Sequence, residues 1–170
     1  MPRRYALTRT LLADRLTFIN HRHGISKVAN VLRQQAKSGK ARFVVGIMDD
    51  DKKFADVHYL RPFASSLPVA ARPGPDCRYH IHQHPAHSHH YLIVMEPACD
   101  TWIFEIAHAT GLAPAYFGLP STLPAIIEVM KDKDAEDNPM IRLLRAIKQA
   151  QPAAYRKLAK FVADIIDQNS

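Results

Sequence analysis

The sequence has few cysteines and no long uninterrupted apolar segment. Cys77 and Cys99 are the only cysteines among 170 residues. Two cysteines define no disulfide framework and are typical of a reduced cytosolic protein. The first residues, MPRRYALTRTLLADRL, carry a charge every few positions, so neither a secretory signal nor a membrane span is predicted there. We therefore expect a cytoplasmic protein that does not use a membrane as a partner.

Acidic residues are absent from one long stretch of the sequence, between Pro139 and Ala163. The basic residues of this stretch are Arg142, Arg145, Lys148, Arg156, Lys157 and Lys160. The whole chain has a formal net charge of +7. Clustered cations attract phosphates over a Debye length of about 8 Å, which favours polyanions as partners. A nucleic-acid or acidic-partner surface that includes Arg142 and Arg145 is therefore predicted, and a solvated basic face kept for solubility is the alternative.

No internal repeat is visible, and the length suits a single domain over residues 1–170 with a sizeable core. FVVGIM (43–48) and YLIVM (91–95) are short apolar runs rich in β-branched residues. Such runs are typical of strands that are covered on both faces, as in a parallel sheet. We expect these two runs to be strands of one small sheet.

Apolar residues recur at helical spacing in five other segments, which predicts helices over residues 24–38, 97–111, 123–131, 140–150 and 153–167. Residues 62–90 are rich in Pro, small residues and His, and are predicted to be one long irregular excursion. The predicted fold is α/β, with a small mostly parallel sheet flanked by helices over residues 1–110. Residues 111–170 are expected to form a helical C-terminal extension.

Three aspartates and two lysines follow the first predicted strand, with no glycine or proline at the turn itself, in the sequence MDDDKK. Asp49 and Asp51 lie two residues apart and share a side if the strand persists that far. Two close carboxylates repel each other unless a cation compensates, and Mg²⁺ is typically held by one or two carboxylates with water and phosphate oxygens. A divalent-metal site is predicted. An ordinary charged turn neutralised by Lys52 and Lys53 is the alternative.

The stretch FVVGIMDDDKK resembles the second conserved motif of TOPRIM domains, in which a strand ends in Asp-x-Asp. These domains are the metal-binding, Rossmann-like fold of topoisomerases, primases, OLD-family nucleases and several phage-defence effectors. YLIVMEPACDTWIFE is similar to a strand followed by an acidic residue and tryptophan in distant TOPRIM-like defence proteins. The resemblance covers residues 1–110 and implies that Asp49 and Asp51 bind Mg²⁺ or Mn²⁺ and are catalytic. In a mechanism of this kind, Lys52 or Lys53 would steady the substrate phosphate.

TOPRIM domains also have a glutamate at the end of their first strand, and this sequence departs from the family there. If LTFIN is the first strand, Asn20 occupies the position of that glutamate. If RRYALT is the first strand instead, the nearest carboxylate is Asp14, on the turn or helix that follows. Glu96, at the end of YLIVM, is a further candidate if the two strands are neighbours. Asp14 and Glu96 are therefore the additional candidate metal ligands, and no general base is assigned.

The segment NHRHGISKV (20–28) combines polar and basic residues with a glycine just before a predicted helix. Backbone N–H groups and the helix dipole can bind an anion at such a turn. Asn20, His21, Arg22 and Lys27 are the candidate phosphate or nucleic-acid ligands here. A turn that Asn20 stabilises by hydrogen bonds is the alternative.

The histidines of HIHQHPAHSHH alternate at His80, His82 and His84, so a strand would place these three on one face. Zn²⁺ needs three or four ligands in tetrahedral geometry, and Cys77 is a candidate fourth ligand. Zinc binding is one interpretation of this run. The alternative is a flexible histidine-rich loop that contacts a partner or nucleic acid.

Two functions follow from these observations. The first is a divergent TOPRIM-like protein with metal-dependent action on nucleic-acid phosphodiester bonds, in the setting of anti-phage defence. The second is a non-catalytic subunit of a defence complex, with a degenerate site, that binds nucleic acid or a protein partner such as an ATPase subunit.

Overall fold

The computed structural model describes residues 7, 11, 24–38, 43–50, 54–66, 68–70, 78–129 and 139–167. The chain forms two compact units. The first comprises residues 21–98 and 165–170, and it contains a β-sheet with helices. The second comprises residues 1–20 and 99–164, and its elements over residues 99–164 are helical.

The sheet has four strands: β1 (Val44–Asp49), β2 (Pro68–Ala70), β3 (Tyr79–His84) and β4 (His87–Met95). Their order is β1-β4-β3-β2. β1 pairs with β4 in parallel, whereas β4 with β3 and β3 with β2 pair antiparallel. The α/β class is confirmed, and the two predicted strands are neighbours. The prediction of a mostly parallel sheet is wrong, because the histidine-rich segment adds antiparallel strands beside the one parallel pair.

The prediction of a long irregular excursion over residues 62–90 is also wrong for the part that the structure describes. This region contains most of α3 (Arg61–Ser65), then β2, β3 and the start of β4. His84 pairs with His87 across the two-residue turn Pro85–Ala86, so the histidine run is a β-hairpin rather than a loop. Ile81 and Tyr79 alternate with the histidines and are buried, which is the apolar–polar period of a strand.

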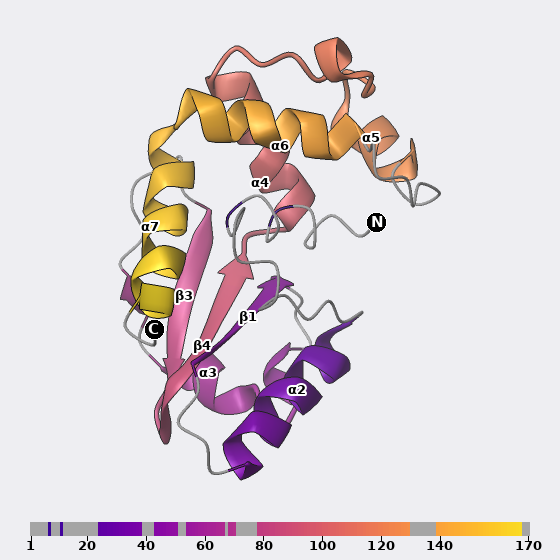
Figure 1. Cartoon of the computed structure of the whole chain (residues 1–170). Helices are drawn as coiled ribbons and strands as arrows, with labels where there is room; N and C mark the ends of the chain where they lie inside the picture. The colour runs from indigo at the N-terminus through magenta and orange to yellow at the C-terminus, as the bar shows by residue number, and fades with distance from the viewer. Residues whose placement is uncertain are drawn as a thin grey trace. The chain divides into compact units, whose positions relative to one another are not determined.

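One face of the sheet is covered by α2 (Ile25–Lys37), α3 and the 3-10 turn η2 (Phe54–Asp56) with the residues that follow it (Figure 1). The buried residues of this core are Ala29, Leu32, Met48, Leu60, Phe63, Leu92 and Val94. Burying each large side chain contributes roughly 1.5–3 kcal/mol. The predicted helix 24–38 is confirmed: Gly24 precedes it with a φ of 78°, and the Ser38 N–H closes its last turn on the Gln34 and Gln35 carbonyls.

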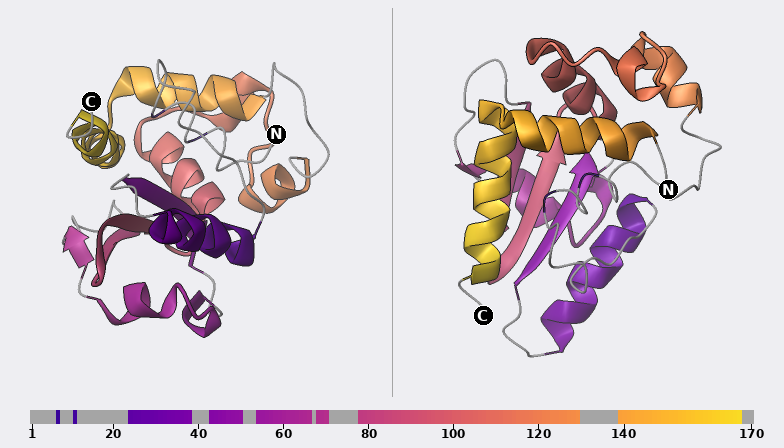
Figure 2. Two further views of the ribbon diagram at one scale, coloured as in Figure 1. Left: turned by 60° about the horizontal axis from the view of Figure 1, so that its bottom comes forward. Right: turned by 45° about the horizontal axis from the view of Figure 1, so that its top comes forward.

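In its described residues the second unit contains α4 (Cys99–Ala109), the 3-10 turn η3 (Pro114–Phe117), α5 (Leu123–Val129), α6 (Pro139–Ala150) and α7 (Ala153–Asp167) as far as Asp164. These helices correspond to the predicted ones, and Trp102 is fully buried in α4. Gln151, with a φ of 49°, and Pro152 separate α6 from α7, and the two helices meet at a corner (Figure 2). Within the described ranges, no helix is long and apolar enough to cross a membrane.

Gly46 brings β1 close to α2. A Cβ at this position would lie 3.0 Å from Leu92 Cδ1 and 3.1 Å from Val28 Cγ1. We expect Gly46→Val to lower the free energy of unfolding by about 1–3 kcal/mol through overpacking, and Gly46→Ala to lower it less. Urea denaturation measures both. Ser88→Val, which adds bulk at an exposed position of β4, is the control and should change stability by less than about 0.5 kcal/mol. Equal losses in Gly46→Val and Ser88→Val would contradict the prediction.

Candidate functional site

Asp49 is the last residue of β1 and lies at the carboxyl edge of the parallel pair that β1 forms with β4. It is opposite Met95 in the register, and the Asp50 N–H donates to the Met95 carbonyl at 2.8 Å. The parallel ladder therefore continues to this edge. The Asp49 carboxylate is half-buried and shares a face of the sheet with Ile47 and Met95.

Glu96 follows β4 directly and so reaches the same edge of the sheet. Its N–H donates to the Arg78 carbonyl at 2.8 Å, and its Oε2 lies 3.0 Å from His80 Nε2. An ionised carboxylate only accepts hydrogen bonds, so His80 Nε2 is the donor. His80 is opposite Val94. Glu96 therefore lies on the Val94 face, whereas Asp49 lies on the Met95 face.

The other predicted residues of the metal site, Asp14, Asp51 and Lys53, lie outside the described residues. Asp49 supplies the hard oxygen donor that Mg²⁺ and Mn²⁺ prefer. Among the residues that the structure describes, no three His, Cys, Asp or Glu side chains are grouped so as to hold a metal ion.

Of the predicted phosphate ligands before the first helix, Asn20, His21 and Arg22 lie outside the described residues. Lys27 is exposed in the first turn of α2. The Lys27 and Val28 N–H groups donate to the Gly24 carbonyl at 3.2 and 3.3 Å. These two backbone donors are therefore used within the helix itself.

The alternating histidines of β3 contact protein groups rather than one another's ring nitrogens. His82 Nδ1 donates to the Ser66 carbonyl at 3.2 Å. Burial lowers the pKa of His82, the bond to Ser66 opposes that shift, and the nearby His80 adds to it. His84 Nδ1 accepts the Ala86 N–H at 3.1 Å. Cys77, the candidate zinc ligand beside them, lies outside the described residues.

A cluster that the sequence did not indicate lies at the turn of this hairpin. It consists of Tyr59, His84, His87 and His90, and we call it the histidine–tyrosine cluster. The ring centroids of His84 and His87 are 4.7 Å apart, those of His87 and His90 are 5.4 Å apart, and those of Tyr59 and His84 are 5.1 Å apart. The Tyr59 hydroxyl and His90 Nδ1 share a hydrogen bond of 2.9 Å. His84 and His90 are buried.

Three members of the histidine–tyrosine cluster, His84, His90 and Tyr59, are held in their neutral forms. Burial lowers the pKa of His90 to about 4, and the neighbouring His87, His84 and His89 add to that shift. Burial also lowers the pKa of His84, again helped by His87. Burial raises the pKa of Tyr59 to about 12. Uncharged rings can stay packed here, whereas a proton on the buried His84 or His90 would place a cation among them.

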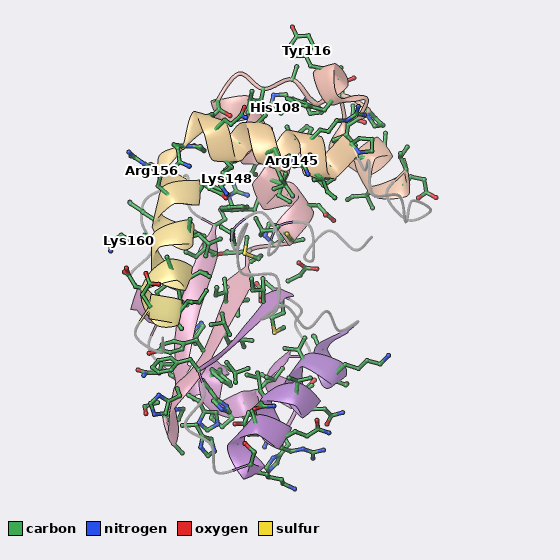
Figure 3. The ribbon with its side chains drawn as sticks, in the orientation of Figure 1. His108, Tyr116, Arg145, Lys148, Arg156 and Lys160 are labelled. Atoms are coloured by element: carbon green, nitrogen blue, oxygen red, sulfur yellow. The ribbon has the colours of Figure 1, made fainter. Side chains whose placement is uncertain are left out.

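The cationic residues of the second unit project from α6 and α7, and we call them the helical basic surface. They are Arg142, Arg145, Lys148, Arg156, Lys157 and Lys160. All except the half-buried Lys148 are exposed. Figure 3 shows Arg156 and Lys160 extending away from α7. Asp164 is the first acidic residue after this stretch, and its carboxylate accepts two hydrogen bonds from Lys160 Nζ, each 2.9 Å long.

Apolar packing orients these cations. In α6 the buried residues are Met140, Ile141, Leu143, Leu144 and Ile147. They recur at helical spacing, so Arg142 and Arg145 must lie on the remaining, exposed side. In α7 the buried Leu158 and Val162 direct Arg156 and Lys160 outward in the same way.

Comparison of the chain with protein-family models, with curated proteins and with solved structures found no match. The TOPRIM resemblance therefore stays a prediction that depends on two short motifs.

The buried, neutral His90 predicts a stability that depends on pH. His90 takes up a proton near pH 6.5 in the unfolded chain but near 4 in the folded one. Because the unfolded state binds more protons below pH 6.5, stability should fall as the pH drops from 6.5 to 4, by about 3 kcal/mol from His90. His82 and His84 act in the same direction. Urea denaturation at pH 7.5 and 4.5 measures this difference.

His90→Gln keeps an acceptor for the Tyr59 hydroxyl but cannot titrate, so it should reduce the pH dependence. His58→Gln, which removes an exposed histidine of the same unit, should leave it unchanged. If His90→Gln loses as much stability between pH 7.5 and 4.5 as the wild type, the assignment to His90 is wrong.

Proposed function

We propose that this protein binds nucleic acid through the helical basic surface of α6 and α7. The observation that carries the proposal is a run of exposed cations over two consecutive helices without an acidic side chain until Asp164. Each cation that contacts a phosphate releases a condensed counterion, which is the main source of nucleic-acid affinity. This function needs no catalytic group and corresponds to the non-catalytic nucleic-acid-binding subunit expected from the sequence.

The arrangement of the cations supports the proposal over a solubility role. A surface kept for solubility usually mixes charges of both signs, and acidic residues are absent here over residues 139–163. The apolar residues of each helix face the core, so the cations lie on the opposite, exposed side. No carboxylate within residues 139–163 is available to neutralise them. Such a field attracts a polyanion strongly at low salt.

Removing two of these cations tests the proposal. We expect Arg145→Gln with Arg156→Gln to weaken binding of a fluorescein-labelled 20-mer roughly tenfold or more in 100 mM KCl. The slope of log affinity against log salt should become shallower by about 1.4 for single strands or 1.8 for duplex, since two counterions fewer are released. Fluorescence anisotropy over a KCl series measures both quantities.

The matched control is Arg33→Gln with Lys37→Gln, which removes two exposed cations from α2. This variant has the same net charge and should bind within about twofold of the wild type at each salt concentration. Equal weakening in the two double variants would mean that net charge, and not the helical basic surface, accounts for binding.

A second function, metal-dependent cleavage of phosphodiester bonds, is favoured by the position of Asp49 at the carboxyl end of β1 beside a parallel neighbour. Ligands of α/β sheets bind at this edge. On this proposal Asp49 and Asp51 would hold Mg²⁺ or Mn²⁺, which polarises the scissile phosphate when bound. The TOPRIM resemblance of the sequence supports this second proposal, and a role in phage defence is part of it.

Asp49→Asn tests the cleavage proposal. With 1 mM Mn²⁺ the wild type should nick supercoiled plasmid or cut single-stranded DNA or RNA, and Asp49→Asn should reduce the rate at least roughly 100-fold because a ligand carboxylate is lost. Asp56→Asn removes an exposed carboxylate of the same unit and is the control. Calorimetric titration with Mn²⁺ gives a readout independent of cleavage. A wild type that binds no Mn²⁺ would refute the proposal.

A further inference from the structure

We propose that Tyr116 is a stacking platform for an unpaired base, so that the helical basic surface prefers single-stranded over double-stranded nucleic acid. The inference rests on the proposed nucleic-acid function and names its substrate class.

Tyr116 is unusual in its exposure. It belongs to η3 and 83% of its surface is exposed, and within the described part of the chain it is the one large hydrophobic side chain that is exposed. Figure 3 shows it extending away from the turn. Other aromatic rings of the second unit, such as Trp102 and Tyr155, are buried in the core. The ring of Tyr116 therefore contributes little to packing and presents its π-face to solvent.

The turn that carries Tyr116 is rigidly held. Pro114 is buried, and the Leu119 N–H donates to its carbonyl at 3.2 Å. The Gly118 N–H donates to the Ala115 carbonyl at 3.0 Å, and Gly118 itself takes a φ of 77° that favours glycine. A ring on such a turn loses little backbone entropy when a ligand binds, which favours its use as a contact.

Arg142 joins this turn to the helical basic surface. Its Nη2 donates to the Phe117 carbonyl at 3.1 Å, directly after Tyr116 in sequence. A Cβ at Gly118 would lie 3.5 Å from the same nitrogen. Arg145 follows one turn later in α6, on the same exposed side as Arg142. An exposed aromatic ring and exposed guanidinium groups thus occur together, at the N-terminal part of α6.

This combination fits a single strand better than a duplex. Proteins that bind single strands pair a cationic track for the phosphates with aromatic rings on which bases stack. In a duplex the base faces are already stacked on each other, so Tyr116 has no base to contact. The cations, in contrast, serve both forms because phosphates are common to both. Tyr116 should therefore affect single-strand binding alone.

The test uses the full chain, a labelled mixed-sequence 20-mer and the duplex made from it, with binding measured by anisotropy in 100 mM KCl. We expect Tyr116→Ala to weaken single-strand binding roughly tenfold and to leave duplex binding within twofold. Tyr116→Phe keeps the ring and should bind like the wild type. Arg145→Gln should weaken both forms.

The salt dependence separates stacking from charge. Tyr116→Ala should leave the salt slope for the single strand unchanged, because stacking releases no counterion, whereas Arg145→Gln should make it shallower by about 0.7. Circular dichroism checks that Tyr116→Ala, at an exposed position, keeps the wild-type melting temperature.

The inference is overturned if Tyr116→Ala binds the single strand like the wild type, or if it weakens the single strand and the duplex equally. In either case the proposed function still stands provided that the double variant of Arg145 and Arg156 weakens binding. A wild-type protein that binds neither form would overturn both proposals.

Discussion

The hydrogen bonding of β4 to strands on both sides is the constraint on which the rest of the first unit depends. β4 pairs in parallel with β1 and antiparallel with β3, so its nine residues fix the register of both neighbours. Because side chains alternate along a strand, this register decides which residues share a face. It directs Leu92 and Val94 toward the core beneath α2, and it places Asp49 and Glu96 at one edge but on different faces.

The same register brings polar rings into a buried position. His90 is on the face of Leu92, and the residues after η2 bring the Tyr59 hydroxyl within hydrogen-bonding distance of it. A buried imidazole without a partner would cost about 1–3 kcal/mol, so Tyr59 makes the arrangement tolerable. The hairpin turn adds His84 and His87. The histidine run is therefore a β-hairpin in which His84, His90 and Tyr59 are kept neutral at neutral pH.

The helices of the second unit show how an apolar pattern positions charge. Residues such as Leu144 and Ile147 bury one side of α6, and the cations between them are left on the other. The core thus determines where the basic surface lies, although no cation takes part in the core. Arg142 is the link between this surface and the η3 turn, through its bond to the Phe117 carbonyl.

The sequence by itself determined the elements with strong periodicity: the two apolar strands, the α2 helix and the helices after residue 97. It also determined the basic stretch, because charge is read directly from residue type. The alternation of Tyr79 and Ile81 with the histidines is a local sign of a strand, but only the tertiary structure decided the mixed sheet and the contact between Tyr59 and His90. These depend on pairing between residues far apart in sequence, such as the 31 positions between Tyr59 and His90, and local residue patterns carry no information about such pairing.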